Sequence, residues 1–534
     1  MEVDCIPFKE TGYFSKLICD YLDQKKELKP FFGHFPDIKN FKVQIAEKEA
    51  NFPEAHRPIL VDVLRTQYKS FEVSEATSEH IASLEKKNTF AVVTGHQLNL
   101  FTGPLYFLYK IISTINLTKQ LKEVYPKHNF VPVYWMATED HDFDEINYFN
   151  FQGKKVQWNL DASGAVGKLK TDGLDSVFNT FFQELGNSTN ANQLNELFQK
   201  AYLGHSNLTD ATRFLANALF GEHGLVIIDG DDVALKKILT PYAEKDIFEN
   251  TAFQKVSESI EALKQVSSDY TIQVNPREIN YFYLVDGVRE RIVEKEGKYV
   301  VNNTEIQFSQ SELKEELKNC PERFSPNVIA RPLYQEVILP NLCYIGGGGE
   351  LAYWLELKSY FQTMEIPFPM LLLRNSALVL TEKQAKKVEK LDLTVSNLFL
   401  KQNSFINKKI REISNIDIDF SEQRKLLEEQ FESMYKLAKE TDETFLGAVK
   451  AQEVKQKNGL DALEKRLLKA QKRKLKDHVI RMTDLQNELF PNQSLQERQL
   501  NFSELYLEFG VKLVPFLVDH LNPTAKGFSI LKIE

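Results

Sequence analysis

The sequence has few cysteines for its length. Four occur in 534 residues, without a Cys-x-x-Cys arrangement: Cys5, Cys19, Cys320 and Cys343. A disulfide framework and a cysteine-rich zinc site are therefore not expected. The first residues also lack the basic stretch followed by an apolar one that a secretory signal needs. We therefore expect a cytoplasmic protein.

Long apolar runs and an excess of basic charge are also missing. No run approaches 18 consecutive apolar residues, so we expect no membrane partner. Lys and Arg number 66 against 75 Asp and Glu, which gives a net charge of −9 and argues against a nucleic-acid binder that relies on a generally basic surface. The 43% apolar and 26% charged residues are ordinary for a soluble globular protein. The length predicts about two to four domains.

Two short β-type runs frame a helical pattern. Residues 90–93 end in Thr94-Gly95-His96-Gln97, and residues 130–136 end in the segment 138–142. Between them a helix is predicted to start at Thr102-Gly103-Pro104, with Thr102 as its cap, and to end near Tyr125. Strand, helix, strand over about 50 residues predicts two neighbouring parallel strands.

Later segments extend this pattern. The apolar runs 225–228 and 370–373 are typical of strands in a parallel sheet that is covered on both faces. The sequence therefore predicts a doubly wound α/β core. Residues 146–160, around Gln152-Gly153, and residues 271–308, around Asp286-Gly287 and Glu296-Gly297, predict small antiparallel β insertions.

Residues 381–489 are rich in Lys, Glu, Gln and Leu and predict long amphipathic helices. One apolar seam is expected at Leu460, Leu463, Leu467, Ala470, Val479, Met482 and Leu489, and a second at Phe431, Met434, Ala438, Phe445 and Val449. The helices pair either with each other or with a partner chain. We expect a homodimer, and an intramolecular hairpin lying on the core is the alternative. The last 40 residues or so predict a helix and a short strand.

The loops after the first two strands carry the main candidate site. In parallel sheets, ligands bind at the carboxyl ends of the strands. Neighbouring strands would bring His96 and Gln97 within about 10 Å of Asp140, His141 and Asp142. Histidine beside a carboxylate suits proton transfer near neutral pH. The alternative for His96 is a loop histidine that caps a backbone carbonyl.

The acidic segment 139–145 offers a second interpretation. Carboxylates with one imidazole could hold Mg²⁺ or Mn²⁺, but adjacent residues point in different directions and cannot all ligate one ion. An acid-rich helix start, which the helix dipole favours, is the alternative.

Four glycines, Gly346 to Gly349, precede a predicted helix, where free N–H groups suit an anion. No Gly-Lys-Ser/Thr follows, so this is not a Walker A loop, and the dinucleotide pattern is also absent. A tightly packed turn is the alternative. Arg331 and Arg374 could each bind a carboxylate or phosphate in bidentate fashion, or could form structural ion pairs.

Several motifs together resemble the cysteine-adding enzymes of bacillithiol biosynthesis. They are Thr94-Gly95-His96-Gln97, Thr102-Gly103-Pro104-Leu105-Tyr106, Trp135 to Phe143, Ser325-Pro326-Asn327, Arg331-Pro332-Leu333-Tyr334-Gln335, Gly346 to Trp354, and Leu495-Gln496-Glu497-Arg498. They run in the same order from about residue 85 to the C-terminus. Position 96 differs, because many relatives have a second glutamine there. The resemblance therefore favours Asp140 and His141 over His96 for proton transfer.

The resemblance implies a Rossmann-like core related to nucleotidyltransferases, with connecting-peptide insertions at about 146–200 and 245–325. This core would span residues 1–380 together with an N-terminal helical segment. A dimerising coiled coil (381–490) and a C-terminal segment (491–534) would follow it. The implied reaction joins the carboxyl of cysteine to the amine of glucosaminyl-malate. Such amide formation normally needs ATP, through an acyl-adenylate or acyl-phosphate, and a divalent metal ion could assist.

The candidate residues fall into three groups under this hypothesis. Proton transfer is assigned to His141, Asp140 and His96. Substrate contacts are assigned to Gln97, Asp142, Asn327, Arg331, Tyr334, Glu350 and Trp354. Nucleotide or phosphate contacts are assigned to Gly346, Gly347, Gly348 and Gly349. The alternatives are a nucleotidyltransferase that acts on another small acid, a metal-dependent hydrolase using the segment 139–145, and a coiled-coil scaffold without activity.

Overall fold

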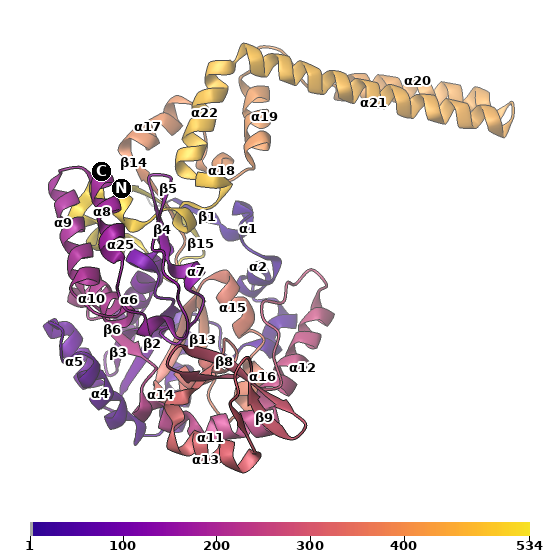
Figure 1. The fold of residues 1–534 in the computed structure, drawn as a ribbon. Helices are drawn as coiled ribbons and strands as arrows, with labels where there is room; N and C mark the ends of the chain where they lie inside the picture. Colours follow the sequence, from indigo (N-terminus) through magenta and orange to yellow (C-terminus); the bar gives the residue numbers. More distant parts are fainter. Residues whose placement is uncertain (1–3, 534) are drawn as a thin grey trace. The chain divides into compact units, whose positions relative to one another are not determined.

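The computed structural model describes residues 4–533, with Glu443 described by its backbone alone. The chain forms two compact units (Figure 1). Unit 1 consists mainly of Tyr13–Leu378 and Gln496–Leu531, and unit 2 mainly of Val379–Leu495. None of the helices described between residues 4 and 533 is both long enough and apolar enough to cross a membrane.

A sheet of five parallel strands forms the centre of unit 1. Its spatial order is β13 (Met370–Leu373), β12 (Asn341–Gly346), β2 (Thr89–His96), β3 (Asn129–Met136) and β6 (Val226–Asp229). Along the chain, the first three strands extend the sheet in one direction and the last two in the other. The order therefore reverses between β2 and β12. This arrangement confirms the predicted doubly wound α/β core and adds β12, which the sequence did not identify as a strand.

Apolar side chains from two helices cover one face of this sheet. The helices are α3 (Phe41–Asn51) and α6 (Tyr106–Val124), and their buried cluster includes Phe41, Ile45, Phe90, Val92, Leu117, Leu121, Phe130, Leu342, Ile345 and Met370. All eight residues of β2 are buried. This is the pattern expected for a parallel strand that is covered on both faces.

Helix α6 begins three residues later than predicted. Thr102 has a positive φ of 69° and precedes the helix rather than capping it, so the predicted cap was wrong. The C-terminal segment satisfies the backbone here instead. The Nδ2 atom of Asn501 donates hydrogen bonds to the carbonyls of Phe101 (2.7 Å) and Gly103 (2.6 Å).

Both predicted β insertions are present. The first contains the hairpin β4–β5 (Tyr148–Phe151, Lys154–Gln157) and the helices α8 (Leu174–Leu185) and α9 (Thr189–Phe198). The second contains α12 (Thr251–Val266), α13 (Gln310–Asn319) and an antiparallel sheet of order β10-β9-β8-β7-β11 (Gln307–Phe308, Lys298–Val301, Val288–Lys295, Tyr281–Val285, Phe324–Pro326).

The remaining elements of unit 1 surround these sheets. Before the central sheet come β1 (Asp4–Pro7), α2 (Lys16–Leu22), α4 (His56–Gln67) and α5 (Glu75–Ser83). Within and after it come α7 (Phe143–Ile146), α10 (Leu208–Phe220), α11 (Val233–Glu249), α14 (Ala330–Ile338), α15 (Gly348–Trp354) and α16 (Lys358–Thr363). The C-terminal segment contains α23 (Gln496–Gln499), α24 (Phe502–Phe509), α25 (Leu513–His520) and β15 (Gly527–Ile533), which pairs with β1.

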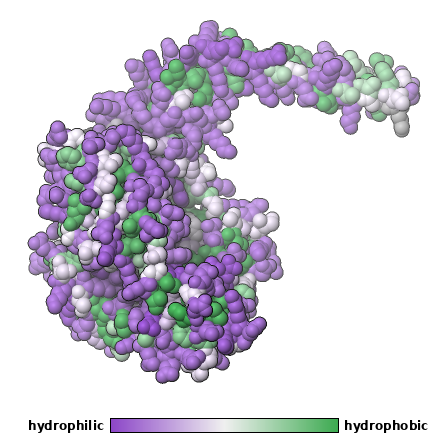
Figure 2. Space-filling model, viewed as in Figure 1, coloured by the Kyte–Doolittle hydropathy of each residue, from purple (hydrophilic) through white to green (hydrophobic). Residues whose placement is uncertain are grey.

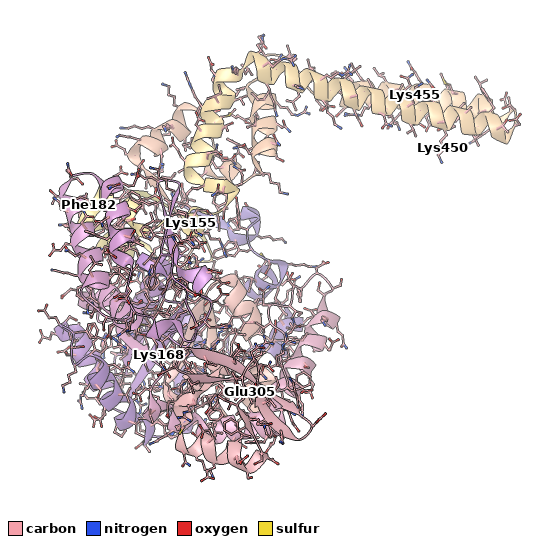
Figure 3. All side chains as sticks on the ribbon, in the orientation of Figure 1. Lys155, Lys168, Phe182, Glu305, Lys450 and Lys455 are labelled. Atoms are coloured by element: carbon pink, nitrogen blue, oxygen red, sulfur yellow. The ribbon has the colours of Figure 1, made fainter. Side chains whose placement is uncertain are left out.

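Unit 2 is helical, as predicted. It contains α17 (Glu382–Lys390), α18 (Val395–Leu398), α19 (Gln402–Ile413), α20 (Ser421–Lys439), α21 (Glu443–Lys474) and α22 (Lys476–Leu489). Helices α20 and α21 form an antiparallel hairpin, which we call the arm, around Phe431, Ala438 and Val449. Met434 and Phe445, expected in the same seam, are 44% and 49% exposed. Lys450 and Lys455 on α21 are also exposed (Figure 3).

Candidate active site

A cavity of about 710 Å³ lies at the carboxyl edge of the parallel sheet in unit 1. The loops that follow β2, β3 and β12 line it, and they contribute His96, Gln97, Asp140, His141 and Glu350 among others. This is the place where the strand order reverses, at which doubly wound sheets bind their ligands. The structure therefore brings together the two loops that the sequence placed at a common edge.

A direct contact joins these two loops. The Nε2 atom of Gln97 donates to Oδ2 of Asp140 (2.8 Å) and to Oε2 of Glu145 (3.0 Å). Burial acts to raise the pKa of Asp140, but hydrogen bonds from His141 and Gln97 outweigh it and hold the pKa well below its ordinary value. Asp140 is thus ionised at neutral pH and is a poor proton acceptor.

His141 lies at the exposed side of the cavity. Its Nδ1 atom is 2.7 Å from Nη1 of Arg289, which can only donate, so Nδ1 is the acceptor in this contact. Its ring also packs against Phe282, with centroids 5.5 Å apart. In this state Arg289 occupies the basic nitrogen of His141.

His96 lies deeper, with 8% of its surface exposed. Its ring packs against Tyr106 and Phe107, at centroid distances of 5.5 and 5.1 Å. Burial lowers its pKa well below the ordinary value, and the charges of Lys110 and Arg374 lower it further. The ring is therefore neutral at pH 7. Among the described residues its Nε2 atom has no hydrogen-bond partner.

In the glycine segment at the start of α15, the Glu350 carboxylate already accepts a hydrogen bond from one of the backbone N–H groups. The N–H of Gly347 donates to Oε2 of Glu350 (2.6 Å), and Oε1 of Glu350 accepts from Nζ of Lys110 (2.7 Å). A Cβ on Gly346 would come within 2.9 Å of the Tyr344 ring, so close packing requires glycine there. Gly347, Gly348 and Gly349 line the cavity, whereas Gly346 does not.

Three expected substrate contacts do not reach the cavity. The hydroxyl of Tyr334 donates to the carbonyl of Gly230 (2.7 Å), and Trp354 stacks on Tyr344 at a centroid distance of 4.4 Å. Both side chains are fully buried and support the cavity wall from behind. Asp142 is exposed at the start of α7. None of these three residues belongs to the cavity lining, so the geometry gives no support for their assignment as substrate contacts.

Asn327 lines the cavity but has a structural task. Its Oδ1 atom accepts from the N–H groups of Ile329 (2.9 Å) and Ala330 (3.2 Å), and its Nδ2 atom donates to Asn280 (3.0 Å). These bonds hold the start of α14, which carries Arg331. The guanidinium carbon of Arg331 lies 5.6 Å from the Trp135 ring and 5.8 Å from the Tyr344 ring.

Positive charge dominates the cavity wall. Seven Lys or Arg residues line it against three Asp or Glu, although the whole chain carries a net charge of −9. The sequence analysis did not select five of the seven: Lys110, Arg277, Arg289, Arg291 and Arg498. Arg374 is the structural ion pair considered as an alternative, because its Nη2 atom lies 2.8 Å from Oε1 of Glu497. A wall of this composition suits anionic ligands.

The acidic segment 139–145 does not converge on one point. Glu139 pairs with the buried Lys236, while Asp140 and Glu145 accept from Gln97. Within residues 4–533 no three His, Cys, Asp or Glu side chains are grouped as metal ligands would be. The interpretation of this segment as a metal site therefore finds no support in the geometry.

The fold and the cavity together define a Rossmann-like protein whose site suits small anionic molecules. The comparison with family models identifies the family to which it belongs. Residues 1–375 match the N-terminal Rossmann-like domain of bacillithiol biosynthesis BshC, and residues 377–533 match its C-terminal coiled-coil domain. The chain belongs to the BshC family of bacillithiol biosynthesis, as the resemblance in the sequence indicated.

Curated relatives agree over the full length. The chain is 59% identical to a "putative cysteine ligase BshC" of Flavobacterium johnsoniae, with 100% of both chains covered. It is 37% identical to the protein of the same description in Cytophaga hutchinsonii (98% and 97% covered) and 30% identical to the one in Bacillus mycoides (93% and 94% covered).

Proposed function

We propose that this protein is a cytoplasmic ligase that joins the carboxyl of cysteine to the amine of glucosaminyl-malate, the last step of bacillithiol synthesis, with consumption of ATP. The relatives carry the description of cysteine ligases. The observation that carries the proposal is the meeting of the His96–Gln97 and Asp140–His141 loops in a cavity that is rich in arginine. Both proposed substrates carry carboxylates, which such a wall would attract.

The amine substrate carries the two carboxylates of its malate group. Arg331 and the arginines of the second insertion, Arg277, Arg289 and Arg291, are the groups that we assign to them. Guanidinium groups bind carboxylates in bidentate fashion, which fixes orientation as well as charge. The amine would then be held near the loops after β2 and β3.

Binding at Arg289 would also prepare the base. In the structure, Nη1 of Arg289 donates a hydrogen bond to Nδ1 of His141. A substrate carboxylate that attracts Arg289 would release this lone pair for the proton of the amine. Asp140, 3.6 Å from Nδ1, would stabilise the imidazolium that forms.

ATP would supply activation of the cysteine carboxyl. The charge of the wall fits a polyphosphate, and Gly347, Gly348 and Gly349 present backbone without side chains to the cavity. Glu350 occupies the N–H of Gly347, so the loop would have to bind phosphate through its other backbone groups. A divalent ion would arrive with the phosphates, since Mg²⁺ is commonly held that way.

We further propose that the chain acts as a homodimer through the arm. Leu437, Val454 and Leu463 are 61%, 52% and 54% exposed on α20 and α21. Apolar side chains are visible along the surface of the arm in Figure 2. A second copy would remove this apolar surface from water.

The reaction is tested with purified protein, cysteine, glucosaminyl-malate, ATP and Mg²⁺, with the thiol product measured by mass spectrometry. We expect His141→Ala to lower turnover by about 10²–10⁴-fold, the usual contribution of a positioned base. His520→Ala, on α25 and outside the cavity lining, is the control and should retain full turnover. Unchanged turnover in His141→Ala would remove this residue from the mechanism. A wild-type enzyme that forms no product would refute the ligase proposal.

A further inference from the structure

Arg331 presents its charge to the cavity without a carboxylate partner. Its guanidinium lies near the rings of Trp135 and Tyr344, and its Nη1 atom donates to Oε1 of Gln335 (3.1 Å). In the described part of the chain no Asp or Glu oxygen lies within ion-pair distance of it. Glu350 acts on this guanidinium only at longer range, so the charge is not neutralised by a direct ion pair and can attract an anionic ligand.

Gln335 is completely buried and uses both ends of its amide. Its oxygen faces Arg331, and its Nε2 atom donates to Oε1 of Glu336 (3.0 Å). The reverse orientation would place the NH₂ group against the guanidinium and the oxygen against the carboxylate. Glu336 therefore fixes the amide orientation that Arg331 needs.

Glu336 is fixed in turn from the N-terminal region. Its Oε2 atom accepts from Nζ of Lys48 on α3 (2.9 Å), and its Oε1 atom accepts from Nδ2 of Asn341 at the start of β12 (2.6 Å). Lys48 and Glu336 are 1% and 0% exposed. Their charges cancel each other, so this ion pair adds no net charge behind the cavity wall.

We propose that the buried Lys48–Glu336 pair, acting through the neutral amide of Gln335, positions the Arg331 guanidinium for an anionic substrate without neutralising it. A carboxylate at position 335 would hold the guanidinium equally well but would compete with the substrate for its charge. Lys48 is thus a positioning residue in a region whose sequence showed no chemical motif. The part of this inference that concerns substrate rests on the proposed function.

The test replaces the pair by apolar side chains. Exchanging a buried ion pair for apolar residues of similar volume commonly preserves stability. The double variant Lys48→Met, Glu336→Leu also removes the acceptor of the buried Asn341 and Gln335 amides, so urea denaturation must first show that it is folded. We expect its KM for glucosaminyl-malate to rise about two- to tenfold, because Arg331 must then be ordered on binding. The kcat should stay within about twofold, since Arg331 binds ground state and transition state alike.

We call the chain of contacts from Lys48 through Glu336 and Gln335 to Arg331 the relay. A second variant removes its middle contact, the one between Gln335 and Arg331. Gln335→Met leaves the ion pair intact and should raise KM by a similar factor. Gln44→Leu is the matched control. Gln44 is buried one turn before Lys48 on the same helix and donates to the carbonyl of Phe368 (3.1 Å), so its loss should leave KM unchanged.

Crystal structures of the wild type and both relay variants provide a readout that does not depend on the reaction. We expect the guanidinium to move away from the rings of Trp135 and Tyr344 in both variants. An unmoved Arg331 with wild-type KM in both would overturn the relay. A displaced Arg331 in an enzyme that forms no thiol product would refute the proposed function and leave the relay standing.

Discussion

Burial changes the ionisation of single residues outside the cavity lining as well as in it. Asp246 lies near the end of α11, and its Oδ1 atom accepts from the N–H of Ala252 (2.6 Å). Burial raises its pKa from 3.8 to about 7, against the effect of this hydrogen bond. The folded state therefore binds this proton more tightly than the unfolded chain does.

The pH dependence of stability follows from this shift. Because the unfolded chain releases the proton first, the contribution of Asp246 to stability falls as the pH rises from about 4 to 7. Three pKa units correspond to at most about 4 kcal/mol. We expect Asp246→Asn, which keeps the acceptor for Ala252, to be more stable than wild type at pH 8 and equal to it at pH 4. Urea denaturation at both pH values checks this, and an equal difference at both would contradict it.

Lys236 forms a buried ion pair with Glu139, which lies in the loop after β3. It is 1% exposed and pairs with Glu139 and Asp231. Removing one partner of a buried pair costs about 3–5 kcal/mol, because a buried charge is left uncompensated. Lys236→Met should lose this much free energy of unfolding in urea, whereas the exposed neighbour Lys237→Met should lose little. Equal stability of the two variants would show that the pair is not a structural anchor.

At the scale of secondary-structure elements, the sequence predicted the strands and hairpins that have a clear apolar pattern or turn motif. Strands β2 and β3 were recognisable as continuous apolar runs, and the hairpins as turn pairs with glycine. Strand β12 was missed because it begins with the polar Asn341, which is buried and donates to Glu336. The predicted cap at Thr102 failed because a segment 400 residues away binds that turn.

The arginines of the cavity show the same limit. Arg289 and Arg291 lie on a hairpin whose existence the sequence predicted. The alternation along a strand predicts which face of the hairpin a side chain lies on. It does not predict which other elements that face contacts. Arg498 was noticed only within a family motif. The sequence therefore predicted the site residues in the loops that follow the parallel strands. It did not predict the site residues that the insertions contribute.

The arm depends on a small core of its own. Phe431 is 4% exposed and packs with Ala438 and Val449. Phe431→Ala should cost about 3–5 kcal/mol of local stability, as truncation of buried aromatics does. Hydrogen exchange should then become faster throughout α20, while Lys436→Ala on the same helix, with an exposed side chain, leaves the exchange rates unchanged. Unchanged protection in Phe431→Ala would mean that contacts outside the hairpin hold α20.

At the scale of the whole molecule, the proposed homodimer can be tested directly. Leu437→Glu combined with Leu463→Glu places charges on two exposed apolar positions of the arm. We expect light scattering to give twice the chain mass for wild type and the single chain mass for this variant. Lys436→Glu, which alters charge but not apolar surface, should remain dimeric. A wild-type protein that is monomeric at micromolar concentration would refute the proposal.

The last part of the chain returns to unit 1. Glu497 holds Arg374, Arg498 lines the cavity, and Asn501 closes the turn before α6. During translation, the ribosome must therefore release almost the whole polypeptide before the pocket gains its final wall. A nascent chain, or a product of premature termination before Gln496, would fold its sheet without a finished site and could not consume substrate.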